Sequence, residues 1–290
     1  MTLMMTRLRS YIRQHPCLKA CLLPVYFRML HLRWLVRNLL SGRCPIAFDA
    51  GKHHLRLYPD GMISEALYGG NFEVNERDFV AAFLQPGMTV VDAGANIGLY
   101  TLISSVLVGA TGRVHSFEPG RLTFDRLQRN LDLNQCQNVV ANRIALSNTR
   151  EQMFLRVDPT HPTLDGHRFV QSMQNVGHPA STDEIVDCQT LDDCFLSGGA
   201  GKVDFMKIDV EGAELSLLQG AEKTLAGSTD ITILLECTHN RDQVRDLLVW
   251  HGFQCFVWDC VGQVLRPAIY DEVVATSNMV LRRQPWNPKL

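Results

Sequence analysis

Three short segments of the chain place a carboxylate directly after an apolar run and within three residues of a glycine or a proline. They read VVDAGANIG at 90–98, HSFEP at 115–119 and FMKIDVEGAE at 205–214. In an open α/β sheet the ligand crevice lies outside the carboxyl ends of the strands. If each apolar run is a strand, then Asp92, Glu118 and Asp209 face one crevice. Carboxylates accept hydrogen bonds, so the chemistry available there is recognition of a cation or of hydroxyl groups.

The first segment predicts a turn that suits a cationic ligand better than a phosphate. Gly94 allows a sharp turn after Asp92, and its missing side chain lets a ligand approach the main chain. The spacing of Gly94, Asn96 and Gly98 differs from G-x-G-x-x-G, the pattern of dinucleotide sites. The charge of Asp92 would also repel a pyrophosphate. S-adenosylmethionine carries an ammonium and a sulfonium, and a carboxylate can hold the ammonium directly or through water.

The second segment adds a candidate for ribose recognition. Glu118 stands at the tip of the next expected strand, where a carboxylate can accept both hydroxyls of a ribose and would repel a 2′-phosphate. The two segments together predict a nucleoside site. Its cofactor-binding residues are expected to be Asp92, Gly94, Ala95, Asn96, Gly98, Glu118, Pro119, Ala145 and Asp209.

Candidates for acid–base chemistry follow two neighbouring strands. Asp209 and Glu211 end the third segment, and Glu236 and His239 follow the apolar run at 231–235. Carboxylates and imidazoles are among the side chains that take or give a proton in general acid–base catalysis. We rank Glu211, His239 and Asp209, in that order, as the catalytic groups that orient or deprotonate an acceptor. Three histidines of the segment 158–183 are expected to be solvated: His161, His167 and His178.

A resident metal is not expected. Asp209 with Glu236 can hold a divalent cation between them, because hard ions prefer oxygen ligands, but two carboxylates make a small ligand set. The spacing of the cysteines does not make a four-ligand zinc site. The nine cysteines are instead expected to be thiols of a reducing compartment, which predicts a cytoplasmic location.

The elements that must position these residues alternate between strand and helix. We expect strands at 46–48, 54–58, 89–92, 113–117, 139–144, 152–157, 203–208, 231–236, 254–258 and 277–281. We expect helices at 75–84, 99–108, 121–134, 213–225 and 241–251. Such alternation predicts a mostly parallel sheet with helices on both faces. The last two strands lack an intervening helix and should pair antiparallel at one edge. Segment 158–183 has weak periodicity, which predicts a long loop of the kind that covers binding sites.

The first 45 residues differ in charge from residues 46–290, which we assign to the α/β domain. Eight basic residues precede the first acid, Asp49, so the N-terminal arm carries about +8 and the remainder about −10. Residues 26–40 predict an amphipathic helix, and no run is long enough to span a membrane. Two interpretations stay open. The helix either lies on the inner face of an anionic membrane as a peripheral contact, or docks on the body with its arginines in water.

The three motifs together resemble the FkbM family of S-adenosylmethionine-dependent methyltransferases, over about residues 70–255. The third motif, with Asp209, Glu211 and Glu214, carries most of the resemblance, because the first two occur in class I methyltransferases generally. The resemblance implies a Rossmann-like fold with a seven-stranded, mostly parallel sheet. It also implies methyl transfer to an oxygen, on a hydroxyl of a secondary metabolite, a sugar or a glycan.

The sequence is less consistent with three other functions. An RNA or protein methyltransferase would share the fold, but the acidic body is a poor surface for a phosphate backbone, so no nucleic-acid partner is expected. The glycine spacing disfavours a nicotinamide-dependent oxidoreductase. A non-catalytic membrane-surface module that uses the basic arm is a further alternative, although the intact acids argue against it. Hydrophobic residues at 46% and charged residues at 20% exclude a wholly disordered chain. The acceptor and the oligomeric state stay open.

Overall fold

The structure is a computed structural model that describes residues 16–40, 46–49, 53–70, 72–157, 168–173, 183–198, 201–237, 239–268 and 278–284. The chain divides into two compact units. The smaller unit comprises residues 1–46 and 57–72, and the larger comprises residues 47–56 and 73–290. The predicted boundary of the arm at residue 45 lies outside the described residues.

The smaller unit is built on two helices, α2 (Pro16–Leu40) and α3 (Met62–Tyr68). The helix expected at 26–40 is thus the second part of a longer helix. Trp34 is 2% exposed, and its ring lies 5.2 Å from that of Tyr68, measured between centroids. His31 Nδ1 lies 2.6 Å from a carboxylate oxygen of Glu65. These contacts hold one side of α2 against α3.

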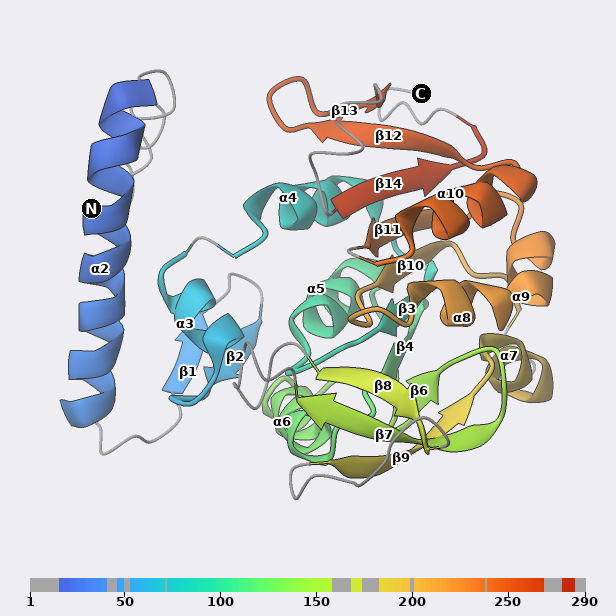
Figure 1. Ribbon diagram of the computed structural model, residues 1–290, viewed down its shortest axis with the longest axis horizontal. Helices are drawn as coiled ribbons and strands as arrows, with labels where there is room; N and C mark the ends of the chain where they lie inside the picture. The colour runs from blue at the N-terminus through green and yellow to red at the C-terminus, as the bar shows by residue number, and fades with distance from the viewer. Residues whose placement is uncertain are drawn as a thin grey trace. The chain divides into compact units, whose positions relative to one another are not determined.

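The larger unit contains an eight-stranded sheet in the order β13-β12-β14-β11-β10-β3-β4-β5 (Figure 1). The strands are β3 (Thr89–Ala93), β4 (Arg113–Phe117), β5 (Val139–Asn142), β10 (Phe205–Ile208), β11 (Thr232–Glu236), β12 (Gln254–Asp259), β13 (Val264–Pro267) and β14 (Asn278–Arg282). The run from β11 to β5 is parallel. Strand β14 lies antiparallel between β11 and β12, which confirms the expected antiparallel edge.

The strand count differs from the seven implied by the resemblance. The additional strand is β13, which pairs antiparallel with β12 through a short turn. We did not expect it, because four residues ending in Pro267 give a weak strand signal. The predicted α/β class with a mostly parallel sheet is confirmed.

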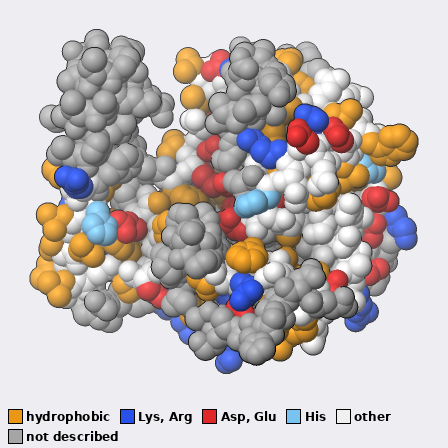
Figure 2. All heavy atoms as spheres, viewed as in Figure 1, with side chains coloured by type: hydrophobic (Ala, Val, Ile, Leu, Met, Phe, Trp, Pro, Cys, Tyr) orange, Lys and Arg blue, Asp and Glu red, His pale blue; other side chains and the backbone are white. Residues whose placement is uncertain are grey.

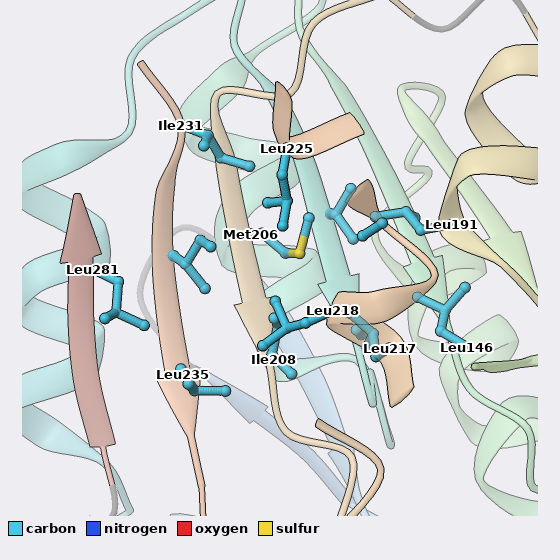
Figure 3. Close-up of a cluster of buried hydrophobic side chains, with 14 of the residues drawn as sticks. Leu146, Leu191, Met206, Ile208, Leu217, Leu218, Leu225, Ile231, Leu235 and Leu281 are labelled. Atoms are coloured by element: carbon cyan, nitrogen blue, oxygen red, sulfur yellow. The ribbon is translucent and has the colours of Figure 1, made fainter. Parts of the chain in front are cut away.

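Helices cover both faces of this sheet (Figure 1). They are α4 (Val74–Phe83), α5 (Leu99–Val108), α6 (Arg121–Leu133), α7 (Leu191–Gly198), α8 (Glu214–Gln219), α9 (Glu222–Gly227) and α10 (Arg241–Trp250). Alternate residues of β10 show how the faces are filled, since side chains of a strand alternate. Met206 and Ile208 join Leu217 and Leu218 of α8 in the main core (Figure 3). Phe205 instead packs its ring near those of α4.

The single helix expected at 213–225 is interrupted. It forms α8 and α9, with Gly220 between them. A Cβ atom at Gly220 would lie 2.0 Å from the carbonyl oxygen of Ser147, so the chain must pass close to another backbone there. Helix α7 was not expected at all.

Two further sheets complete the larger unit. A four-stranded sheet has the order β6-β9-β7-β8, from β6 (Ala145–Leu146), β7 (Glu151–Val157), β8 (Arg168–Ser172) and β9 (Glu184–Gln189). The expected loop at 158–183 was therefore wrong in part, because it contains β8, which pairs antiparallel with β7. Its remaining stretches, with the three loop histidines, lie outside the described residues. The strands β1 (Ile46–Asp49) and β2 (His54–Leu57) pair with each other. Among the described helices, none has the length and apolar character needed to cross a bilayer.

Candidate active site

The parallel register brings the three motif acids to one edge of the main sheet. Lys207 of β10 pairs with Asp92 of β3, and Asp209 follows β10 directly. Glu118 follows the neighbouring strand β4, and Glu236 ends β11 on the other side of β10. The expected arrangement of acids at neighbouring strand ends is present.

The glycine turn after β3 is shaped by the neighbouring strand end. Gly94 has φ +82°, and a Cβ atom placed on it would lie 1.8 Å from the carbonyl oxygen of Asp209. Our interpretation that the missing side chain gives room to a ligand was therefore incomplete, because that position faces backbone. Gly98, at φ +95°, makes similar room for Leu127 of α6. Both glycines bring main chain and side chains of neighbouring elements into close contact.

Asp92 is buried beneath this turn. Thr101 of α5 donates its hydroxyl to Asp92 Oδ2 at 2.5 Å, and the same hydroxyl lies 2.9 Å from that of Ser116. Burial raises the pKa of Asp92 to about 6, although the Thr101 bond and Lys207 oppose the rise. The carboxylate is thus held in a fixed orientation and carries a proton more readily than an exposed aspartate.

Glu118 is also buried, and protein groups already occupy much of its carboxylate. Oε1 accepts the backbone N–H of Gly120 at 2.9 Å and the hydroxyl of Thr123 at 2.6 Å. Oε2 accepts the backbone N–H of Asn96 at 2.9 Å. A carboxylate has about four acceptor positions, so the described residues leave room for one more donor, on Oε2. The role of Glu118 in ribose binding stays a prediction, and Oε2 is the oxygen that has an acceptor position open for it.

The centre of the site is a buried lysine that sequence reasoning missed. Lys207 is 2% exposed, and its Nζ lies 3.4 Å from Asp209 Oδ2 and 5.3 Å from the centroid of the Tyr100 ring. Tyr100 donates its hydroxyl to Glu73 at 2.5 Å. Burial alone would lower the pKa of Lys207, but the surrounding carboxylates raise it well above its ordinary value, so the lysine is charged.

Carboxylates outnumber this one cation. Those that raise the pKa of Lys207 are Asp209, Glu73, Glu236 and Asp92. Burial raises the pKa of Glu236 to about 7, and repulsion by Asp209 adds to the rise while Lys207 opposes it. Burial likewise raises the pKa of Glu73. The excess of negative charge makes the site suited to a ligand that brings positive charge.

The two carboxylates that we considered as cation ligands from the sequence, Asp209 and Glu236, do lie close together, and a third acid lies beside them. One carboxylate oxygen each of Glu73, Asp209 and Glu236 lie within 4.8 Å of one another. Hard divalent ions accept such ligands. Lys207 already supplies a positive charge to the same group, so the donor set alone does not establish a metal site.

The remaining predicted residues lie in several parts of the larger unit. His239 Nδ1 is 3.5 Å from the Cβ position of Gly212, so the loop that carries Glu211 and the loop after β11 lie side by side. Glu211 has φ +51° and is partly exposed, and His239 is exposed. Ala145 lies elsewhere, in the apolar cluster of the small sheet. Pro119 is partly exposed beside Glu118, while Ala95 is buried in the glycine turn.

S-adenosylmethionine fits the residues present. Its ammonium and sulfonium match the excess of carboxylates near Lys207, and Glu118 keeps one acceptor for a ribose hydroxyl. Asp92 and Glu118 belong to adjacent strands, so one elongated ligand can reach both regions. The site therefore offers charge recognition at one end and hydroxyl recognition at the other.

Comparison with known proteins agrees with this description. The Methyltransferase FkbM domain model matches residues 92–255, which is more than half of the chain. "Methyltransferase 1" of Beauveria bassiana is 31% identical over 179 residues, covering 57% of this chain and 71% of that protein. "Hexuronic acid methyltransferase AglP" of Haloferax volcanii is 28% identical over 159 residues, which cover 54% of this chain and 59% of that protein. This chain thus spans about three fifths of the archaeal relative.

A solved structure is similar at lower identity. The FkbM methyltransferase from Methylobacillus flagellatus KT superposes with a TM-score of 0.45 and 16% identity, covering 76% of this chain and 54% of that one. The family match over residues 92–255 begins at Asp92 of the first motif and contains the second and third motifs in full. The chain therefore belongs to the FkbM family of S-adenosylmethionine-dependent methyltransferases.

Proposed function

We propose that this methyltransferase acts on a hydroxyl oxygen of a sugar, a glycan or another small metabolite. The observation that carries the proposal is the pair Asp209 and Glu236, whose carboxylate oxygens lie within 4.8 Å of each other beside the buried Lys207. Transfer to an alcohol calls for a group that accepts a proton, and these carboxylates are such groups. The hexuronic acid methyltransferase among the relatives adds support for a sugar acceptor.

The surroundings of each residue in the site determine which step of the reaction it can assist. S-adenosylmethionine supplies, when bound, a methyl group attached to a sulfonium. An alcohol oxygen reacts faster when a base takes its proton, and a base works best with a pKa near the working pH. The pKa of Glu236, at about 7, meets that condition. Glu236 is thus the strongest acceptor of the hydroxyl proton, with Asp209 as the group that orients the alcohol.

Glu211 and His239, which the sequence analysis ranked first as catalytic groups, lie on two loops beside the strand ends that carry Asp209 and Glu236. Their loops lie side by side, and His239 is exposed while Glu211 is partly exposed. We propose that they contact the acceptor and hold its hydroxyl toward Glu236. Positioning of this kind supplies a large part of the rate in a displacement reaction.

The acceptor class is tested by incubating the protein with a methyl-deuterated cofactor and a panel of uronic acids, neutral sugars and phenolic metabolites. Mass spectrometry then locates the label in the product. A labelled methyl ether supports the proposal. Label on nitrogen or carbon, with no labelled ether from any alcohol, contradicts it.

The roles of the carboxylates are tested with an acceptor that the panel identifies. The rate should rise with pH around 7 in the wild type, and Glu236→Gln should lose this rise together with most of the turnover. Glu211→Gln and His239→Ala should lower turnover while cofactor affinity stays within about twofold, because they act on the acceptor. A pH profile unchanged in Glu236→Gln would assign the base elsewhere.

A divalent cation is tested separately. Treatment with EDTA should leave the rate unchanged if Lys207 alone balances the carboxylates. Loss of activity that Mg²⁺ restores would show that Glu73, Asp209 and Glu236 bind an ion.

We also keep the cytoplasm as the proposed location. The six cysteines described with their side chains form no disulfide with one another. Free thiols of this kind are typical of a reducing compartment.

A further inference from the structure

Helix α2 carries a row of exposed apolar side chains that the methyltransferase site does not use. The row consists of Met29, Leu32, Val36, Leu39 and Leu40. These positions recur every three or four residues, so they lie on one side of the helix. Leu39 and Leu40 are 80% and 83% exposed, which is unusual for neighbouring leucines. Hydrophobic side chains are visible on the surface over this end of α2 in Figure 2.

The opposite side of α2 already has a partner within the smaller unit. Trp34 and Asn38 are buried, and Trp34 packs against Tyr68. Leu30 lies against Gly69, just beyond α3. The exposed row is therefore a second apolar side, separate from the one that packs on α3.

Basic side chains border the exposed row and acidic ones do not. With 3.6 residues per turn, Arg33 lies along one border of the row and Arg28 along the other. Both are exposed, and α2 contains no Asp or Glu. An apolar face flanked by arginines suits a surface that is apolar inside and anionic outside, because arginine can keep its head group at the polar boundary. That combination describes a lipid bilayer with anionic head groups.

The surface beside the row is hollowed. An open depression of about 550 Å³ is lined by Leu32, Arg33, Val36, Arg37, Leu40 and Tyr68. Its walls are mainly apolar, and two arginines are among its lining residues. A depression of this size and polarity can receive part of an acyl chain while an arginine contacts the phosphate above it.

We propose that α2 lies in the surface of an anionic bilayer, with the exposed row among the acyl chains and Arg28 and Arg33 at the lipid phosphates. The helix lies along the surface and does not cross it. The proposal concerns a different surface from the methyltransferase site and stands whether or not the acceptor is a sugar.

The test uses the full chain and sedimentation with vesicles. One set contains phosphatidylcholine alone and the other a mixture with phosphatidylglycerol. We expect binding to the mixed vesicles only, weakening as salt reduces the Debye length from about 10 Å at 0.1 M to about 3 Å at 1 M. Leu32→Gln combined with Leu39→Gln should reduce the bound fraction at least about tenfold, because two leucine side chains no longer insert among the acyl chains. Arg28→Gln combined with Arg33→Gln should also weaken binding and reduce its salt dependence.

A matched control is available on the larger unit. Val249 and Val261 are 61% and 92% exposed, so Val249→Gln combined with Val261→Gln removes apolar surface elsewhere. This control should bind vesicles as the wild type does. All variants should bind S-adenosylmethionine in calorimetry, which separates loss of membrane binding from misfolding. Absence of wild-type binding to anionic vesicles at low salt would overturn the proposal. Vesicle binding by the leucine variant equal to that of the wild type would also overturn it. So would a wild-type chain that does not bind vesicles but forms a concentration-dependent dimer, if the leucine variant stays monomeric.

Discussion

The Cβ position of Gly94 lies 1.8 Å from the carbonyl oxygen of Asp209. The first and third motifs of the sequence are thus in backbone contact, although more than a hundred residues separate them. This contact sets the distance between the turn after β3 and the end of β10. Because Asp209 belongs to the carboxylate cluster, the geometry of that cluster depends on a residue without a side chain.

Gly94→Ala tests this contact. The new methyl group overlaps backbone, and alanine is also strained at φ +82°. We expect a loss of unfolding free energy of roughly 3 kcal/mol or more, since overpacking and a left-handed alanine both contribute. The matched control is Gly252→Ala, at φ +79° with open space around it, which should cost only about 1–2 kcal/mol. Urea denaturation measures both, and equal losses would show that the contact has no special weight.

Lys207→Met tests the balance of charge between this buried lysine and the carboxylates around it. The substitution keeps most of the length of the side chain and leaves the carboxylates around it unopposed. Removing one partner of a buried ion pair costs about 3–5 kcal/mol, which we expect at pH 8. At pH 6 the loss should be smaller, because Asp92 and Glu236 then take up protons. Lys202→Met is the control, since Lys202 is about half exposed and its ion pairs contribute little. A pH-independent loss would contradict this account.

Glu236→Gln should stabilise the protein above neutral pH. The pKa of Glu236 is raised from 4.5 to about 7 in the folded state, so the folded state holds a proton that the unfolded state has released. The stability associated with this group is therefore full below about pH 4.5 and is lost as the pH rises through 7. Removing the group should raise the melting temperature at pH 8 and change it little at pH 4.5. Glu222→Gln, at an exposed helical position, is the control. A melting temperature lowered at pH 8 would show that Glu236 stabilises the fold as an anion.

Glu118 and Thr123 separate ribose binding from structural support. Glu118→Ala should weaken cofactor binding by about 1–3 kcal/mol, the scale of a charge-assisted hydrogen bond, and should lower stability as well. Glu118→Gln should lose less. Thr123→Val removes a donor from Oε1 and leaves Oε2 unchanged, so it should lower stability with affinity nearly intact. Calorimetry and thermal melting measure the two effects, and equal affinity in all three variants would place the ribose elsewhere.

The sequence was sufficient for those parts of the fold where pattern and local chemistry agree. The helix at 99–108 and the strand at 113–117 have the bounds that we expected, because glycines and apolar runs define their ends. Strand β8 was missed, since five residues between segments rich in glycine and proline give a weak signal. Lys207 could have been suspected, because a lysine inside an apolar strand must be either buried with partners or wrongly assigned.

Glu73 could not have been found in this way. It belongs to none of the motifs, and it reaches the cluster because the chain enters α4 through a left-handed residue, with φ +43°. Its contact with Tyr100 joins the start of α4 to α5, the next helix along the chain. Such a contact follows from tertiary packing, which a single amino-acid sequence does not reveal.

The occupied acceptor positions of Glu118 also affect which nucleosides the protein can distinguish. With one position left on Oε2, the carboxylate can bind one of the two ribose hydroxyls and is indifferent to the other. The 2′-deoxy and 3′-deoxy analogues of the cofactor should then differ in affinity from each other. Glu118 would thus select one hydroxyl position, where a fully open carboxylate would recognise the vicinal diol as a whole.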